Sequence, residues 1–436
     1  MLRAFASAFR TPDLRKKLLF TFAILALFRF GASVPTPNTN TSAINSCIKN
    51  AANGSNANIY SLINLFSGGA LLRLSAFALG ILPYITASII IQLLVVVIPR
   101  FDQLKKEGQS GQQKLTQYSR YLTIGLAILQ STGFIALARS GQLFPSCQSS
   151  ILYKTDIFTL STMVICMTAG TGIIMWLGEL ITDRGVGNGM SVLMFTSIAA
   201  RIPNEGQLIL QNAGGFIFTL ICLLGLAIII AVVFVEQAQR RIPVQYAKRM
   251  IGRRQYGGTS TYLPLKVNQA GVIPVIFASS LLYIPQLLSQ LTSNNSNTGF
   301  ARWVNNYLIN QQSFVYILVY FALIIFFTYF YVGITFDPVE RADDMKKYGG
   351  FIPGIRPGRP TAEYLQFVLS RITLPGSLYL GIVAILPNFF FSITSSNAQN
   401  FPFGGTAVLI MVGVALDTVK QIESQLMQRN YEGFLR

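Results

Sequence analysis

Long apolar runs without a single charged residue constrain this chain more than any other feature of its sequence. Each run is close to the roughly 20 residues that an α-helix needs to cross about 30 Å of hydrocarbon. Charged residues make up only 11% of the chain, whereas a soluble domain carries about 25%. The apolar side chains must therefore face lipid or one another, and the sequence predicts an all-α integral membrane protein. The clearest charge-free runs are 76–97, 121–138, 157–178, 215–235, 267–291 and 315–336.

Three further segments set the expected number of spans. The charge-free stretch 372–416 is too long for one span and is interrupted by proline, asparagine and glycine, so we expect two spans with an outside turn. The apolar segments 18–34 and 187–202 bring the prediction to ten spans. Ten spans allow two pseudo-symmetric, inverted halves of five, as in some transporters. The expected halves are residues 1–202 and residues 203–436.

The distribution of basic residues predicts the orientation. The chain has 34 basic and 16 acidic residues. With the N-terminus inside, 27 of the basic residues fall in cytoplasmic segments and six fall in outside segments. Cytoplasmic loops of membrane proteins carry an excess of Lys and Arg, so we expect both termini in the cytoplasm. Attraction to anionic lipid headgroups is an alternative reason for part of this excess.

No residue pattern in the chain indicates an enzyme. There is no histidine, no phosphate-binding glycine loop and no pair of carboxylates in an apolar span, so we expect no catalytic residue, no metal and no cofactor. Cys166 and Cys222 fall in predicted spans, where packing is their expected role. Cys47 and Cys147 fall in predicted outside loops and could form a disulfide bond, although sequence alone does not show that they come close enough.

Three segments between spans are unusual. Segment 59–75 is apolar but contains Gly68, Gly69 and Arg73, which favours a re-entrant half-helix beside a cavity or an interfacial helix. The predicted cytoplasmic loop 236–266 is long and basic. A second such loop, 337–366, is rich in proline and glycine, which predicts turns rather than helix. Long loops on a rigid scaffold often carry function, the alternative being plain connectors.

Several blocks of sequence, spread from one end of the chain to the other, resemble the SecY family, the central pore subunits of the Sec protein-export channel. They occur in the family's order and at matching positions in the predicted topology. The departures lie mainly in the asparagine-rich outside loops. The blocks are FSGGALLRLSAFALGILPYITASIIIQLL at 66–94, KKEGQSGQQKLTQYSRY at 105–121, MWLGELITDRGVGNGMS at 175–191, QRRIPVQYAKRMIGRRQYGGTSTYLPLKVNQAGVIPVIFASS at 239–280, FIPGIRPGRPTAEYL at 351–365 and FGGTAVLI at 403–410.

The resemblance implies a protein-conducting channel that passes unfolded secretory chains and releases apolar segments into lipid. Carried over by position, a ring of apolar side chains would seal the pore, with Met194 at a position where a β-branched or similar residue is expected. A plug of about residues 63–72 would close the pore, and a lateral gate would lie between spans 76–97 and 267–291. The implied ring is Ile81, Ile85, Met194, Ile276 and Ile410; the implied plug residues are Asn64, Phe66, Gly68, Gly69 and Leu71; the implied gate residues are Gln92, Asn268 and Gln269.

The resemblance also implies partners and a location. The partners would be SecE-like and SecG-like small membrane subunits, the SecA motor ATPase, the ribosome, secretory preproteins with their signal sequences, and membrane lipid. The channel would lie in the inner (cytoplasmic) membrane and do no chemistry itself. The two long cytoplasmic loops would form a docking platform for the motor or the ribosome. The expected docking residues are Arg240, Arg241, Arg253, Arg254 and Arg356.

Two other classes of membrane protein remain possible from the residues alone. A secondary transporter built from inverted repeats would have ten spans too, but transporters place ionisable residues at the midplane, where this chain is apolar. A structural membrane anchor would not account for the long basic loops.

Overall fold

The structure is a computed structural model. The residues that it describes are 11–44, 46, 70, 74–139, 151–246, 249–251, 254–256, 260–279, 281–282, 313–394 and 405–434. The described helices are α2 (Pro12–Ser33), α5 (Leu82–Val97), α6 (Pro99–Lys106), α7 (Gln109–Arg139), α8 (Ile157–Arg184), α9 (Gly189–Ala199), α10 (Ile202–Gln237), α13 (Phe314–Thr335), α14 (Pro338–Lys347), α15 (Arg359–Thr394) and α16 (Gly405–Phe434). Residues 273–279 are also helical.

The long helices have the length and hydropathy of membrane spans. Among the described residues, five helices meet both criteria. Helices α5 and α6, which are bent by 101° at the break between Val97 and Pro99, give a sixth if the pair is counted as one span. Large apolar side chains on these helices are exposed, including Phe216, Phe234 and Phe314, as expected where lipid is the solvent. The chain is therefore a multi-pass membrane protein. The count of ten spans stays a prediction, because several predicted spans lie partly outside the described residues or fail the length or hydropathy criterion.

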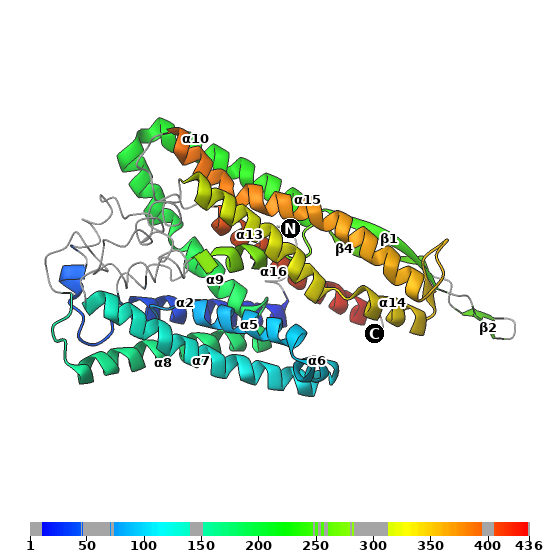
Figure 1. Cartoon of the computed structure of the whole chain (residues 1–436), viewed down its shortest axis with the longest axis horizontal. Coiled ribbons are helices and arrows are strands. Elements are labelled where there is room, and N and C mark those ends of the chain that lie inside the picture. Colours follow the sequence, from blue (N-terminus) through cyan, green and yellow to red (C-terminus); the bar gives the residue numbers. More distant parts are fainter. Residues whose placement is uncertain are drawn as a thin grey trace.

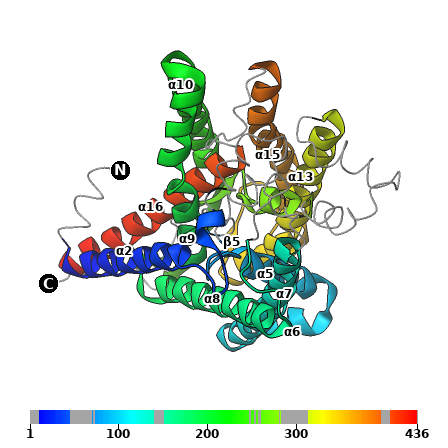
Figure 2. The same cartoon turned by 90° about the vertical axis from the view of Figure 1, so that its left-hand side faces the viewer.

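The helices form two groups that face each other. In Figure 1, α5, α7 and α8 lie in the lower part of the molecule with α2 beside them, while α10, α13 and α15 fill the upper part. Figure 2 shows the same division from the side and places α2 along α16. The division of the chain into halves near residue 202 stays a prediction. The inverted symmetry of the two halves stays a prediction.

Two predicted boundaries differ from the structure. The span predicted at 76–97 becomes helical only at Leu82, because the preceding backbone turns and Gly80 has a positive φ of 58°. Apolar composition cannot distinguish such buried turns from a helix. The predicted outside segment after residue 202 is helical, since α10 begins at Ile202 and runs to Gln237.

The fold is not purely helical, because the long basic loop contains strands. They are β1 (Gln239–Tyr246), β2 (Arg249–Ile251), β3 (Arg254–Tyr256), β4 (Ser260–Lys266) and β5 (Gly350–Phe351). β1 pairs antiparallel with β4 and also with β5, giving the order β4-β1-β5, while β2 and β3 form a separate hairpin. Alternation explains β1: Ile242 and Val244 are buried and their neighbours are exposed. The sheet joins the two long loops, 236–266 and 337–366, into one body.

The second long loop is partly helical, contrary to the prediction of turns throughout. Asp337 caps α14, since its carboxylate accepts from the backbone N–H of Val339 at 2.9 Å, and Pro338 occupies the first turn. The turns lie after this helix, where Gly349, Gly354 and Gly358 all have positive φ. The proline and glycine signal was therefore correct for 349–358, but wrong for 338–347 and for 359–366, which belong to α14 and α15.

Candidate functional site

The predicted ring residues meet in one cluster of buried apolar side chains at the centre of the molecule. Ile81, Met194, Ile276 and Ile410 all belong to it, and Ile85 packs against it. They come from separate parts of the chain: the start of α5, α9, the helical residues 273–279 and α16. Ile81 and Ile410 are each 1% exposed and Met194 is 9% exposed. We call this set of side chains the central cluster.

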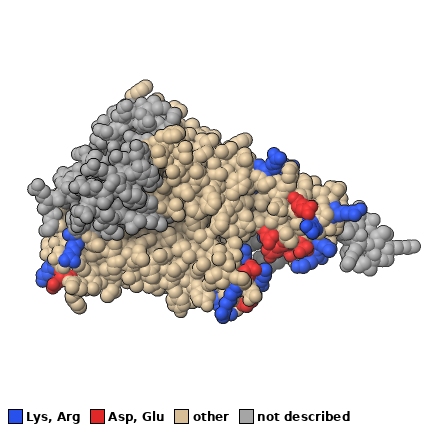
Figure 3. Space-filling view, in the orientation of Figure 1, with Lys and Arg blue, Asp and Glu red and all other residues tan. Residues whose placement is uncertain are grey.

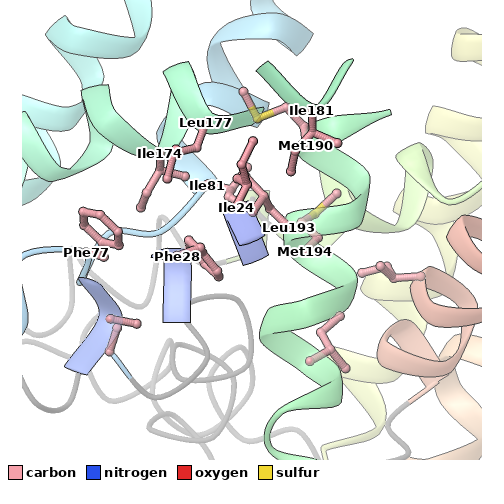
Figure 4. Packing of buried hydrophobic residues seen from close by; sticks show 14 of the residues in the cluster. Ile24, Phe28, Phe77, Ile81, Ile174, Leu177, Ile181, Met190, Leu193 and Met194 are labelled. Atoms are coloured by element: carbon pink, nitrogen blue, oxygen red, sulfur yellow. The ribbon is translucent and has the colours of Figure 1, made fainter. Parts of the chain in front are cut away.

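Neighbouring helices complete the central cluster with residues that the sequence did not single out. In Figure 4, the side chains of Ile24, Ile81 and Leu193 meet between α8 and α9, close to Met194. Leu193 is fully buried. No sequence signal separates these residues from ordinary packing positions, because each is one more apolar residue in an apolar helix. The additional buried members are Ile24, Phe28, Ala32, Ala70, Phe77, Ile174, Leu177, Ile181, Met190, Leu193, Ile198 and Ala407.

Close backbone contacts hold α8 and α9 around the central cluster. A β-carbon at Gly189 would lie 1.8 Å from the carbonyl oxygen of Gly178, so only glycine fits there. The start of α9 is fixed by Asn188, whose side chain accepts from the N–H of Met190 at 3.2 Å. The N–H of Gly189 donates to Thr182 Oγ1 of α8 at 2.9 Å. Met194 is therefore carried by a short helix with a well-defined start.

The three predicted gate residues belong to the described part of the chain, whereas the predicted plug residues do not. All five predicted plug residues, Asn64, Phe66, Gly68, Gly69 and Leu71, lie outside them; Ala70 of the same segment is buried in the central cluster. Gln92 is exposed on α5 and Gln269 is partly buried. Asn268 is buried, and its amide donates to Glu236 Oε1 of α10 at 2.5 Å and to the carbonyl of Gly271 at 3.2 Å. The gate role of these residues stays a prediction.

Four of the predicted docking residues, all of them described, lie at the end of the molecule that carries the sheet. Arg240 and Arg241 are exposed on β1, and the guanidinium of Arg241 lies 5.3 Å from the ring centre of Tyr262 on β4. Arg356 is exposed in the turn before α15, where its carbonyl accepts from Thr361 Oγ1 at 2.9 Å. Arg254 belongs to β3, and Arg253 lies outside the described residues. Figure 3 shows Lys and Arg gathered at this end, interspersed with Asp and Glu.

The ion pair between Arg120 and Glu179 was not predicted from the sequence. Arg120 of α7 donates to both carboxylate oxygens of Glu179 on α8, at 2.8 and 2.9 Å, and its Nη1 donates to Gln117 at 3.0 Å. Both residues are only partly exposed. The pair could not be predicted because each residue directly flanks a charge-free run. A charged residue at such a position is ordinarily interpreted as part of a loop. A bidentate pair of this kind fixes α7 against α8.

The described residues offer little for metal or thiol chemistry. Within the described ranges, no three His, Cys, Asp or Glu side chains come close enough together to hold a metal ion. Cys166 and Cys222 are free thiols. Cys47 and Cys147, the predicted disulfide pair, lie outside the described residues.

Comparison with known proteins gives one consistent result. The family model described as SecY matches residues 75–419. The protein translocase subunit SecY of Mycobacterium tuberculosis is 65% identical and that of Streptomyces coelicolor is 62% identical, each over the full length of both chains. A solved protein-conducting channel superposes with a TM-score of 0.64 at 18% identity, covering 94% of this chain and 91% of its own. Canine Sec61 in a ribosome–channel complex gives 0.59 at 18% identity, with the same coverage. The resemblance is thus confirmed, and the chain belongs to the SecY family.

Proposed function

We propose that this chain is the pore subunit of a protein-conducting channel, which passes unfolded secretory polypeptides across a membrane and releases apolar segments sideways into lipid. The observation that carries the proposal is the central cluster, in which ring residues from four separate parts of a SecY-family chain are buried together. Relatives with 62–65% identity are named protein translocase subunits. A narrow apolar constriction resists a continuous file of water, so this cluster would hold back ions at rest.

The channel itself would catalyse no reaction. Energy would come from a SecA-like motor ATPase or from a translating ribosome, and small SecE-like and SecG-like subunits would complete the assembly. Two neighbouring folds support the ribosome as a partner: canine Sec61 is described in a ribosome–channel complex and yeast Ssh1 is described bound to the ribosome. The exposed arginines of β1 and of the turn at Arg356 would receive either partner, because Arg binds phosphate and carboxylate through a planar fork of donors.

The distribution of basic residues supports a location and an orientation for the chain. The chain would lie in the cytoplasmic membrane with both termini inside, because the basic residues concentrate on that side. Reporters fused after Gly257 and Gly354 should read inside, and those fused after Asn53 and Asn295 should read outside. A reporter at Gly257 that reads outside would invalidate this topology.

Reconstitution tests the proposed function. The purified complex with its small subunits is placed in lipid vesicles with a motor ATPase, ATP and an unfolded precursor. We expect precursor to become protected from protease in an ATP-dependent manner, and protection to disappear when the vesicles are dissolved. If no precursor is protected although the complex is intact and the motor hydrolyses ATP, the proposed function is wrong.

A further inference from the structure

The segment between residues 74 and 81 begins with a strained residue inside the protein. Leu74 has a φ of +44° and is fully buried. A bulky residue rarely takes this left-handed conformation, because its side chain crowds the neighbouring carbonyl. Such outliers persist only where the surrounding structure enforces them, and they concentrate at functional sites. The contacts that hold Leu74 in this conformation are therefore candidates for a functional role.

Thr36 holds Leu74 in this conformation. The carbonyl oxygen of Leu74 accepts two hydrogen bonds from Thr36, one from its backbone N–H at 2.9 Å and one from its hydroxyl at 2.7 Å. The N–H of Ala76 donates to the carbonyl of Val34 at 2.9 Å, which adds a third bond between the two segments. Thr36 is 3% exposed. Water therefore cannot replace the hydroxyl if it is removed.

The loop that carries Thr36 is itself fixed on its other side. The side chain of Asn38 pairs with the backbone of Lys154, accepting from its N–H at 2.9 Å and donating to its carbonyl at 2.7 Å. The hydroxyl of Thr39 donates to the carbonyl of Thr36 at 2.7 Å. These hydrogen bonds fix the loop, so Thr36 would not move together with Leu74 if Leu74 were displaced.

A short, tightly packed stretch connects Leu74 to the ring residue Ile81. Phe77 stacks on Phe28 of α2 with ring centres 6.1 Å apart. A β-carbon at Gly170 of α8 would lie 1.9 Å from the carbonyl oxygen of Ala76, so backbone lies against backbone there. Leu79 is also buried. These contacts tightly pack most of the stretch, so a displacement of Leu74 would be passed along it toward Ile81.

We propose that Thr36 is a positioning residue of the channel: its two hydrogen bonds to Leu74 hold this strained residue and the segment 74–81 in place and thereby keep Ile81 in the central cluster when the channel is at rest. The inference rests on the proposed channel function and adds a residue that controls the seal. Thr36 lies on the loop after α2 and has no place in the ring itself.

The test is a graded series at one position in the full-length, reconstituted complex. Thr36→Ser keeps the donor, Thr36→Cys supplies a weak donor, and Thr36→Val keeps the shape without a donor. The matched control is Thr123→Val: Thr123 is equally buried, but its hydroxyl donates to Ser119 in its own helix, 2.7 Å away. The measurements are the opening frequency of the resting channel in planar bilayers, the rate of precursor export and the melting temperature in detergent.

We expect the opening frequency to rise in the order Ser, Cys, Val, with Ser near the unmodified channel and Val about fivefold above it, the population shift expected for one lost hydrogen bond. Export should continue in all variants. If Thr36→Val opens no more often than Thr123→Val, or if Ser and Val behave alike, Thr36 is only a folding residue and the inference is overturned. That result would leave normal export intact, so it is distinct from a failure of the proposed function, in which the unmodified complex itself exports nothing.

Discussion

Ile81 owes its position to the turns before it more than to a helix. It immediately precedes the first residue of α5, and the backbone from Leu74 onward is irregular and buried. Met194, by contrast, sits within α9, and its unbranched side chain can adapt to a passing chain. The central cluster therefore combines one side chain fixed by its backbone with another that can reshape, which suits a seal that opens and closes again.

Replacing ring residues with small polar ones should open a leak. Ile81→Ser combined with Ile276→Ser lowers the cost of a water file through the constriction, so we expect the resting channel to conduct ions in planar bilayers. The control is Ile324→Ser combined with Ile422→Ser, since both residues are as fully buried but lie in other clusters. Unchanged conductance in the ring variant, or equal conductance in the control, would show that Ile81 and Ile276 do not form the constriction.

At the scale of elements, hydropathy predicted where most helices lie but not how they meet. The apolar runs located α8, α10, α13, α15 and α16, because lipid-facing helices need about 20 apolar residues. Hydropathy gave no indication that β1 pairs with β5, because the paired residues are more than 100 positions apart in the sequence. Nor could it show that segment 74–81 is irregular, since buried turns and buried helices draw on the same apolar residues. The ring residues are predicted only through a family resemblance, because each looks like ordinary packing on its own.

Two glycines of α8 should respond in opposite ways to the same substitution. Gly170→Ala places a β-carbon against the carbonyl oxygen of Ala76, which cannot retreat, so we expect a destabilisation of about 1–3 kcal/mol. A β-carbon at Gly172 would meet no other atom within 4 Å. Gly172→Ala should therefore stabilise by up to about 1 kcal/mol through helix propensity. Thermal unfolding of both variants in the same detergent measures the difference; equal melting temperatures would mean that α8 does not pack on segment 74–81.

The sheet-bearing loops should respond to charge reversal as one docking surface. Arg356→Glu should slow motor-driven export, and Arg356→Lys should restore it only partly, because Lys keeps the charge without the planar fork. Arg253→Glu with Arg254→Glu should weaken ribosome binding in a salt-dependent assay. The control is Arg100→Glu on α6, an exposed arginine of a different loop. If export and ribosome binding are normal in all the variants, these arginines serve lipid contact or orientation alone.

At the scale of the whole molecule, the central cluster lies between two groups of helices. Ile81 and Met194 belong to residues 1–202, whereas Ile276 and Ile410 belong to residues 203–436. Figure 1 shows α9 and α16, which carry Met194 and Ile410, between the lower helices α5, α7 and α8 and the upper helices α13 and α15. A seal built from both groups must loosen whenever they move apart. The same movement would open a path through the molecule and a path sideways to lipid, which links the two proposed activities of the channel.

Cross-linking to an arrested chain tests whether a polypeptide passes through the central cluster. A photoreactive residue is placed at Ile81, Met194, Ile276 or Ile410 in turn, and a precursor is halted midway through the reconstituted channel. Matched positions on exposed helix faces are Ile165 and Leu226. We expect the halted chain to cross-link to each of the four ring positions and not to the two exposed positions. Cross-links at Ile165 and Leu226 without any at the ring positions would contradict it.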